Sequence, residues 1–385
     1  MAPVELDAFL ADVTDLLTIP STEDRPDALG RALDFVVDYV GAGFTVERFE
    51  SNGKPSALVH TGAPRREFAD ARGGGSTWQF RVVLNGHVDV VPGAPDQFRP
   101  RLHGGRLFAR GAQDMKVSAL IQALVFREVA ADLPYPLALQ IVTDEEVGGR
   151  DGTLHQIERG VVADFVVIGE HSGLDVVADS KGLFHVTLRA AGAAGHSAYP
   201  WLGDNALLRL LSAVSRVMAR YPVPEAEQWR TTVNLARIHT SNRTFNQIPA
   251  EAEAWLDVRY PAEDSEINGR TVEEIRAHFS DLCGSGVTVE VDHLDPPHHA
   301  DHDRADIVAL RHAARREGYG GALLRKHGAG DGRHYYQRGI DAVAFGVGGA
   351  GQHGPREYAD VDTFVPYHRA LTHYLTGLAV PDPVT

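Results

Sequence analysis

His87 and Asp89 lie two residues apart at the end of an apolar strand, in the segment Leu84–Pro92. This spacing suits a metal-binding imidazole and the carboxylate that orients it. Acidic groups and one more histidine follow along the chain, at Asp114, Glu145, Glu146, Glu170 and His353. Imidazoles and carboxylates in such numbers are typical of a hydrolase that uses two metal ions.

Length and composition limit the possible classes of protein. A chain of 385 residues exceeds the usual size of one hydrophobic core, so we expect two domains. The net charge of -15 argues against a nucleic-acid-binding surface. The single cysteine, Cys283, excludes an internal disulfide. Acids near the N-terminus, where a secretory signal carries bases, and the lack of a long apolar run predict a cytoplasmic protein without a membrane partner.

The first part of the chain alternates strands with helices, which predicts an α/β fold with a mixed, largely parallel central sheet flanked by helices. Buried strands are expected at residues 81–85, 137–143 and 164–169, and a packed helix at 117–129. The Gly/Arg-rich stretch 63–76 predicts an exposed loop. The candidate residues therefore fall at strand ends and helix starts, where open α/β sheets bind ligands.

From about Lys181 the pattern changes to strand, helix, two strands, helix and strand. Asp204 is a plausible cap of the first helix, whose core face is predicted to contain Leu207, Leu211, Val214, Met218 and Tyr221. Strands are expected at 231–238, 253–260 and 287–291, with a helix at 271–282 between the last two. We predict a small α+β domain at 181–294, inserted into a discontinuous domain made of 1–180 and 295–385.

The motifs together resemble those of the co-catalytic zinc metallopeptidases, the family of succinyl-diaminopimelate desuccinylase, acetylornithine deacetylase, aminoacylase-1 and carboxypeptidase G. The resemblance runs from about Asp7 to Leu375 and keeps the order of the family's motifs. The resemblance identifies the family but does not distinguish among its members. It implies a zinc-binding catalytic domain interrupted by a lid and dimerisation domain, a four-stranded antiparallel sheet with two helices.

By this resemblance, His87 and Glu170 are expected to hold one zinc ion, Glu146 and His353 the other, and Asp114 to bridge both. A bridging carboxylate is the group that draws two cations to within ~3.5–4 Å. The resemblance thus implies two Zn²⁺ per subunit, with Co²⁺ or Mn²⁺ as possible substitutes. Taken alone, Asp114 is equally suited to capping the helix that follows it.

Two further acids acquire roles from the same resemblance. Asp89 is expected to accept a hydrogen bond from the non-ligating nitrogen of His87. Glu145 is expected to be the general base, which takes a proton from the attacking metal-bound water and passes it to the departing amine. Without this context, Glu145 and its neighbour Glu146 would be assigned to a solvated turn. The family also has a cis peptide after its bridging aspartate, here between Asp114 and Met115.

The inserted domain carries three more candidates. His196, in Gly195–Pro200, is expected to reach the active site of a partner subunit and stabilise the oxyanion, which implies a homodimer; a capping or packing role is the alternative. Arg259 and Asn246 resemble lid residues that bind a substrate carboxylate, a group that suits a guanidinium. For Arg259 the alternative is an ion pair on the strand surface. Arg333, in the stretch beginning at Gly330, matches a family segment near the substrate.

Three features depart from the family or compete with its motifs. His171 replaces the usual proline after Glu170, where it would crowd or supplement the first metal. The Gly-rich stretch 328–331 lacks the hydroxyl residue that the family usually has before its aspartate, here Asp331, which leaves the substrate class open. The stretch 298–303, with three histidines, follows a Pro-Pro turn and is interpreted as a chance cluster on a surface loop.

The sequence therefore predicts a binuclear zinc amidohydrolase that cleaves the amide bond of an N-acyl amino acid, or a related conjugate, bearing a free carboxylate. The alternative within the family is a dipeptidase or carboxypeptidase. Outside this class, the alternative is a catalytically silent relative that binds a ligand or partner. A single-zinc hydrolase, with Asp114 unbridged, is also open.

Overall fold

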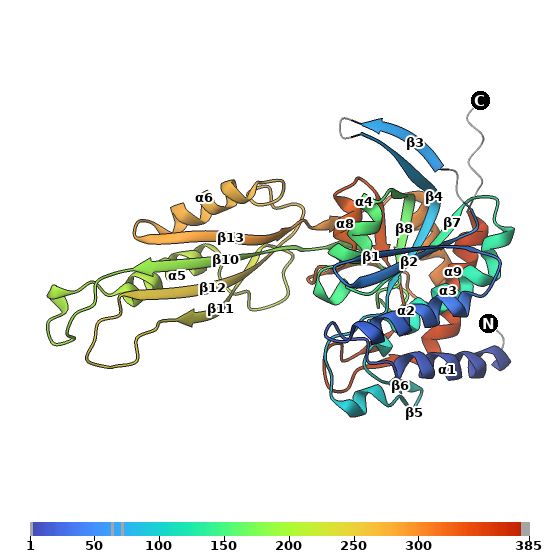
Figure 1. Ribbon diagram of the computed structural model, residues 1–385, viewed down its shortest axis with the longest axis horizontal. Coiled ribbons are helices and arrows are strands. Elements are labelled where there is room, and N and C mark those ends of the chain that lie inside the picture. The colour runs from blue at the N-terminus through green and yellow to red at the C-terminus, as the bar shows by residue number, and fades with distance from the viewer. Residues whose placement is uncertain (1–2, 63–64, 71–72, 379–385) are drawn as a thin grey trace. The chain divides into compact units, whose positions relative to one another are not determined.

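Two units of structure make up the computed structural model, which describes residues 3–62, 65–70 and 73–378 (Figure 1). Unit 1 contains the described residues up to Asp179, 299–325 and those from Gly330 onward. Unit 2 contains residues 180–298 and 326–329.

Unit 1 is built on a mixed sheet with strand order β1-β2-β7-β4-β8-β16-β9-β14, to which β3 adds by pairing with β4 and β15 by pairing with β9. The strands are β1 (Thr45–Ser51), β2 (Lys54–His60), β3 (Arg65–Asp70), β4 (Gly73–His87), β7 (Leu137–Val142), β8 (Val161–Ile168), β9 (Val176–Ser180), β14 (His298–His299), β15 (Leu323–Lys326) and β16 (Asp341–Ala344). β4 is parallel to both β7 and β8, and β16 is parallel to β8. A second, small sheet has the order β17-β18-β6-β5 and contains β5 (Arg101–His103), β6 (Arg106–Phe108), β17 (Gly349–Ala350) and β18 (Tyr358–Asp360).

The central strands of unit 1 are buried on both faces. Every residue of β7 is buried, which explains its continuous apolar sequence. Val82 and Leu84 face one hydrophobic cluster and Val83 faces another, on the opposite side of the sheet. The first cluster lies beneath α1 (Pro3–Leu17), α2 (Pro26–Val40), α3 (Val117–Val129), α7 (Ala305–Arg316) and α9 (Phe364–Gly377). The second lies beneath α4 (His155–Glu158) and α8 (Gly332–Tyr336).

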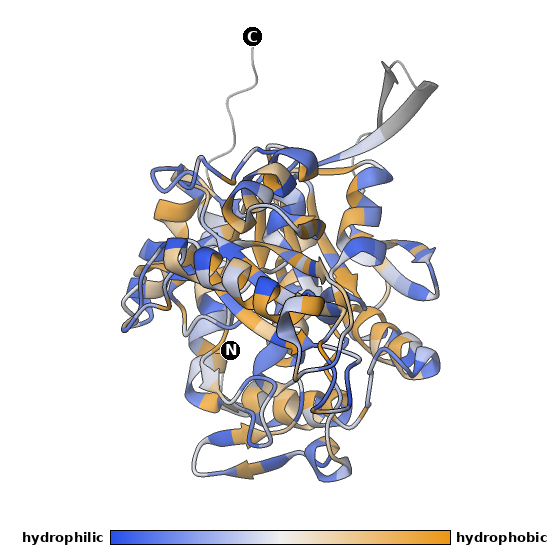
Figure 2. Ribbon diagram, turned by 90° about the vertical axis from the view of Figure 1, so that its left-hand side faces the viewer, coloured by the Kyte–Doolittle hydropathy of each residue, from blue (hydrophilic) through white to orange (hydrophobic). Residues whose placement is uncertain are grey.

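Unit 2 is an antiparallel sheet of order β11-β12-β10-β13 with two helices. Its elements are β10 (Gly182–Ala191), α5 (Ala206–Arg220), β11 (Thr232–His239), β12 (Glu251–Tyr260), α6 (Val272–Cys283) and β13 (Val287–Asp295). Alternate residues of β10 are buried, and they form one core with the apolar faces of α5 and α6. Figure 2 shows the alternation of hydrophobic and hydrophilic residues along the helical ribbons that such packing requires.

These elements confirm the predicted fold class, a mixed α/β unit and a four-stranded antiparallel sheet with two helices. The helix expected at 117–129 has the same bounds as α3. Among the described helices, none combines the length and apolarity needed to cross a membrane.

Two local predictions were wrong, and a third was wrong at one residue. The stretch 63–76 is not a loop, because Arg65–Asp70 pair antiparallel with the start of β4; residues 63–64 and 71–72 lie outside the described part. The cap of α5 is Asn205 rather than Asp204, since the Asn205 side chain accepts hydrogen bonds from two backbone N–H groups of the first turn. The predicted core face of α5 is confirmed except at Leu211, which is 43% exposed while Leu210 is buried. The other four predicted residues belong to the unit 2 core or pack against it: Leu207, Val214, Met218 and Tyr221.

Candidate metal centre

Parallel strands bring four acidic and imidazole side chains to one edge of the unit 1 sheet. His87 is the last residue of β4, and Glu170 follows the end of β8 by two residues. Glu145 and Glu146 lie in the short 3₁₀ helix η4 (Glu145–Val147), just beyond β7. Because β4 is parallel to both β7 and β8, these groups emerge at the same carboxyl edge.

Two remaining candidates reach this edge from turns. Asp114 lies in the irregular turn η2 (Ala112–Lys116) before α3, and the peptide between Asp114 and Met115 is cis, as expected. His353 lies in the loop between β17 and β18, with a left-handed φ of 58°. Its side chain is half exposed, whereas Asp114 is buried.

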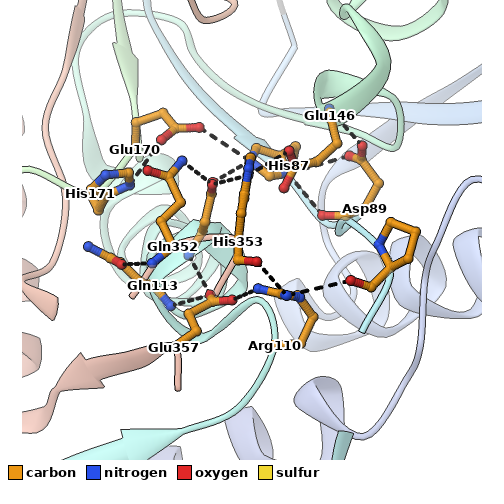
Figure 3. A network of polar contacts seen from close by, with 12 residues as sticks. His87, Asp89, Arg110, Gln113, Glu146, Glu170, His171, Gln352, His353 and Glu357 are labelled. Atoms are coloured by element: carbon orange, nitrogen blue, oxygen red, sulfur yellow. Dashed lines mark hydrogen bonds and ion pairs between the residues drawn. The ribbon is translucent and has the colours of Figure 1, made fainter. Parts of the chain in front are cut away.

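The side chains form two groups that share one carboxylate (Figure 3). His87 Nε2 lies 3.1 Å from Asp114 Oδ1 and 3.2 Å from Glu170 Oε1. His353 Nε2 lies 3.3 Å from Asp114 Oδ2 and 3.0 Å from Glu146 Oε2. The two oxygens of Asp114 therefore face different groups, and each group offers one imidazole and two carboxylates.

Asp89 contacts one residue of each group. Its carboxylate Oδ1 lies 3.4 Å from His87 Nδ1, and its backbone oxygen lies 3.1 Å from the same nitrogen. Its Oδ2 accepts a hydrogen bond of 3.0 Å from the backbone N–H of Glu146. Asp89 thus orients His87 and also holds the turn that carries Glu146.

Asp114 is positioned by three residues that sequence reasoning missed: Glu357, Gln113 and Gln352. Glu357 accepts hydrogen bonds from the backbone N–H groups of Gln113 and Asp114, at 3.0 and 3.2 Å, and pairs with the buried Arg110 at 2.5 Å. The side chain of Gln352 donates to Asp114 Oδ2 at 2.5 Å. The backbone N–H of Gln352 in turn donates to the side-chain oxygen of Gln113. Gln113 next to Asp114 and Gln352 next to His353 could have been suspected from their positions in the chain, whereas Glu357 lies beside no candidate residue.

The charges of these side chains suit a bound cation. Burial opposes protonation of His87, but hydrogen bonds to Asp114, Asp89 and Glu170 outweigh it and raise its pKa well above the ordinary value. Burial and the neighbouring Asp114 raise the pKa of Glu146 to about 7. Both shifts arise where negative charge is concentrated and little exposed to water, the condition that a divalent metal relieves. The donor set therefore fits two divalent cations bridged by Asp114.

Glu145 has a different environment from that of Glu146, its neighbour in the chain. It belongs to neither of the two groups with metal-ligand spacing. Burial raises its pKa well above the ordinary value, and Glu170 and Asp331 add to the effect against an opposing contribution from His87. A carboxyl group with a raised pKa, beside the candidate ligands but outside both groups, is suited to accepting and returning a proton.

His171 lies beside the candidate ligands without entering either group. Its Nδ1 is 3.3 Å from Glu170 Oε2, whereas the other oxygen of Glu170 faces His87. The imidazole thus contacts the carboxylate on the side away from His87.

Arg333 and His334 support the turn after the paired glutamates. Both are buried, and they donate to the backbone oxygen of Gly148, at 2.7 Å from the Arg333 guanidinium and 3.0 Å from His334 Nε2. The structure therefore places Arg333, a predicted substrate-binding residue, against the segment that carries Glu145 and Glu146.

The buried His334 gives the protein an acid-sensitive contribution to stability. Burial, with a smaller effect of Arg333, lowers the pKa of His334 to about 3, whereas an unfolded histidine titrates near ~6.5. The unfolded chain binds the additional proton, so this stability is present above pH ~6.5 and is lost as the pH falls toward ~3. We expect the free energy of unfolding of the metal-free protein, from urea melts, to fall by several kcal/mol over this range.

The His334→Gln variant keeps an N–H donor for Gly148 but cannot titrate, so its stability should depend less on pH. The exposed His312 provides the matched control, His312→Gln, whose stability should follow that of the wild type. Parallel curves for wild type and His334→Gln would refute the assignment.

Unit 2 holds the remaining candidates. His196 is exposed, and its Nδ1 accepts a hydrogen bond from the backbone N–H of Ala198 at 3.1 Å. The backbone oxygen of Asn246 accepts one from Ser197 at 3.0 Å, so His196 and Asn246 lie on adjoining segments.

Arg259 lies elsewhere in unit 2. It pairs with Leu183 across the sheet, near the start of β10, whereas His196 follows the end of β10. At ~3.3 Å per residue, the strand from Leu183 to Ala191 separates the two ends by about 26 Å. The Arg259 guanidinium makes two contacts with Asp257, of 2.8 and 3.0 Å. The structure therefore shows the surface ion pair that was the alternative for Arg259.

Comparison with known proteins agrees with these observations. The model of Peptidase family M20/M25/M40 matches residues 83–377. Succinyl-diaminopimelate desuccinylase of Thioalkalivibrio sulfidiphilus is 30% identical over 320 residues, which cover 78% of this chain and 84% of that protein. A probable carboxypeptidase of Aspergillus terreus is 30% identical over 344 residues, 79% of this chain and 77% of that protein. The crystal structure of a tripeptidase from Staphylococcus aureus shares the fold, with a TM-score of 0.75 at 16% identity, over 96% of this chain and 97% of that chain.

Proposed function

Because this chain belongs to peptidase family M20/M25/M40, and is thus a hydrolase of amide or peptide bonds, we propose that it removes the acyl group from an N-acyl amino acid or related conjugate with a free carboxylate. The observation that carries the proposal is the position of Asp114, whose two oxygens face two separate imidazole-carboxylate groups. This arrangement suits two divalent cations, for which zinc is our first choice, with Co²⁺ or Mn²⁺ as substitutes.

The proposed ligands are His87 and Glu170 for one cation, Glu146 and His353 for the other, and Asp114 for both. When bound, such ions polarise a substrate carbonyl and lower the pKa of a coordinated water to ~7.

Glu145 moves the proton in the proposed reaction. Its carboxylate takes a proton from the water that attacks the amide carbonyl, and the resulting carboxylic acid gives this proton to the departing amine. The same residue is thereby restored for the next turnover. Its raised pKa suits both steps, because a carboxyl group with a pKa above the ordinary range is a stronger base and holds the proton long enough to pass it on.

We assign recognition of the substrate carboxylate to Arg259 and Asn246. Asp257 shows the geometry in which Arg259 accepts a carboxylate, with two hydrogen bonds to one guanidinium. A substrate carboxylate would take the place of Asp257. Arg333, held against Gly148, would then act by positioning the glutamate turn.

We also propose that the protein is a homodimer in which His196 completes the site of the partner subunit. The separation of about 26 Å along β10 supports assigning Arg259 and His196 to the sites of different subunits. Arg259 lies near the point where the chain enters unit 2, whereas His196 lies beyond the far end of the strand. His196 would stabilise the oxyanion through a ring N–H.

Amine release by the zinc-loaded protein tests the proposal, with N-acetyl, N-succinyl and longer N-acyl amino acids, glutamyl conjugates and dipeptides as substrates and a chelated control. We expect metal-dependent turnover of one N-acyl class. The similarity to a probable carboxypeptidase favours peptide cleavage as the second candidate, which would appear as turnover of the dipeptides alone. Failure of the whole panel by protein that holds two metal ions per chain would refute the substrate assignment.

A further inference from the structure

We propose that Asp179, His299 and His302 form a separate binding site for a divalent transition-metal ion such as zinc. The sequence had suggested that the histidines at 298–302 cluster by chance on a loop. The structure adds a carboxylate from β9, 120 residues away from His299 in the chain. The proposal does not rest on the proposed function, because the three residues lie outside the candidate metal centre.

The three side chains converge on one point. Asp179 Oδ1 lies 2.6 Å from His299 Nδ1, and Asp179 Oδ2 lies 2.8 Å from His302 Nε2. One ligand atom from each residue falls within 4.8 Å of the other two. Two imidazole nitrogens and a carboxylate are a common set of protein ligands for catalytic and open zinc sites.

The backbone holds these residues in place. The backbone N–H of Ala300, which follows His299, donates to the oxygen of Ala178, which precedes Asp179, at 3.0 Å. The Asp179 side chain is only 5% exposed, so its carboxylate is enclosed by the groups that it contacts. A rigid, enclosed carboxylate with two imidazoles is the preorganised part of a metal site.

The imidazoles can adjust to an ion. Zinc bonds of ~2.0–2.1 Å place the ligand atoms of a tetrahedral site about 3.3 Å apart, so each ring must withdraw from Asp179 by roughly half an ångström. His299 and His302 are 45% and 33% exposed, which leaves room for this movement. They border a cavity of about 510 Å³ that Asp301, Tyr336 and Asp341 also line. Water in this cavity would supply the fourth ligand.

Arg325 is the cation that competes for the same carboxylate. Its Nε lies 3.6 Å from Asp179 Oδ2, beyond the range of a direct hydrogen bond. The Asp341 carboxylate is already paired with Arg304 at 2.8 Å, but Asp301 brings a further negative charge to the cavity. The neighbourhood therefore still favours a divalent ion.

The register of the sheet separates this site from the candidate metal centre. Val177 pairs with Ala344, so Asp179 lies level with Ala342, which in turn pairs with Val166 of β8. Glu170 lies four residues beyond Val166 in the chain, two past the end of β8. The two sites are therefore about 13 Å apart along the strands and about 10 Å apart across them. An ion held by Asp179 would tie the returning segment 299–302 to β9, a structural role.

Zinc titration in a background that lacks the candidate metal centre tests the proposal. In the His87→Ala/His353→Ala variant, calorimetry should find one Zn²⁺ bound per chain. Adding His299→Ala and His302→Ala should weaken this binding by at least about 100-fold, because two of three ligands are lost. Adding His312→Ala, at an exposed histidine of α7, should leave it unchanged. Equal binding with and without His299 and His302, or no zinc in the background variant, would overturn the proposal.

A second measurement covers the case in which the background variant fails to fold. In the otherwise unaltered protein, saturated with zinc and freed of excess metal, His299→Ala/His302→Ala should hold one ion fewer per chain than His312→Ala. Its thermal unfolding midpoint should also rise less on addition of zinc, because a ligand stabilises only the state that binds it. Equal metal content in the two variants would overturn the proposal.

Discussion

Replacing Glu145 with glutamine is expected to lower kcat by about 10⁴-fold, near the upper end of the range for general acid–base catalysis. The size follows from the two proton transfers assigned to this one carboxylate, neither of which an amide can perform. Metal content should remain that of the wild type, because Glu145 lies outside both groups with metal-ligand spacing.

Turnover of the best substrate and metal analysis on the same sample check this expectation. The matched control is Glu158→Gln, at a half-exposed glutamate of α4 that pairs with Arg338 on the surface. It should leave kcat within about twofold of the wild type, since exposed ion pairs contribute little. A Glu145→Gln variant that keeps wild-type kcat would remove Glu145 from the mechanism.

Replacing Asp114 with asparagine is expected to cause the second large loss. Asparagine keeps the shape of the side chain but offers one neutral oxygen in place of two charged ones, so it cannot serve both groups. We expect no more than one tightly bound ion per chain and a fall in turnover of more than about 10³-fold, because the two ions act as a unit.

Metal analysis after dialysis, followed by turnover in excess zinc, separates loss of affinity from loss of chemistry. Asp38→Asn, at an exposed position of α2, is the control and should keep both properties. Two ions and normal turnover in Asp114→Asn would show that Asp114 does not bridge.

Local sequence pattern was sufficient to predict the strands that carry the candidate metal centre. An unbroken apolar run predicts a buried strand wherever parallel neighbours cover both faces, as in β7. The polar residues that end such runs, His87 and the pair at 145–146, then fall at one edge of the sheet. The same logic is wrong at one position of α5, because Leu210 and Leu211 are equally apolar and only packing against the sheet selects Leu210.

The sequence could not reveal contacts between distant segments. Glu357 supports Asp114 from 243 residues away, and Asp179 joins His299 from 120 residues away. Neither carboxylate lies in a motif, so each resembles any other acid until the sheet brings its partner beside it. The ion pair of Arg259 with Asp257 was foreseeable as an alternative, because residues two apart in a strand share a face.

The place of β16 in the sheet has a consequence for synthesis of the protein on the ribosome. β16 lies between β8 and β9, although it follows them by more than 160 residues. At 5–20 residues per second, His353 is made roughly 10–40 s after Glu170. During this interval the nascent chain has the acidic part of its candidate centre but lacks one histidine, and the adjacent edges of β8 and β9 are open. Such edges pair readily with other chains, so the newly made protein needs protection from aggregation until its C-terminal strands arrive.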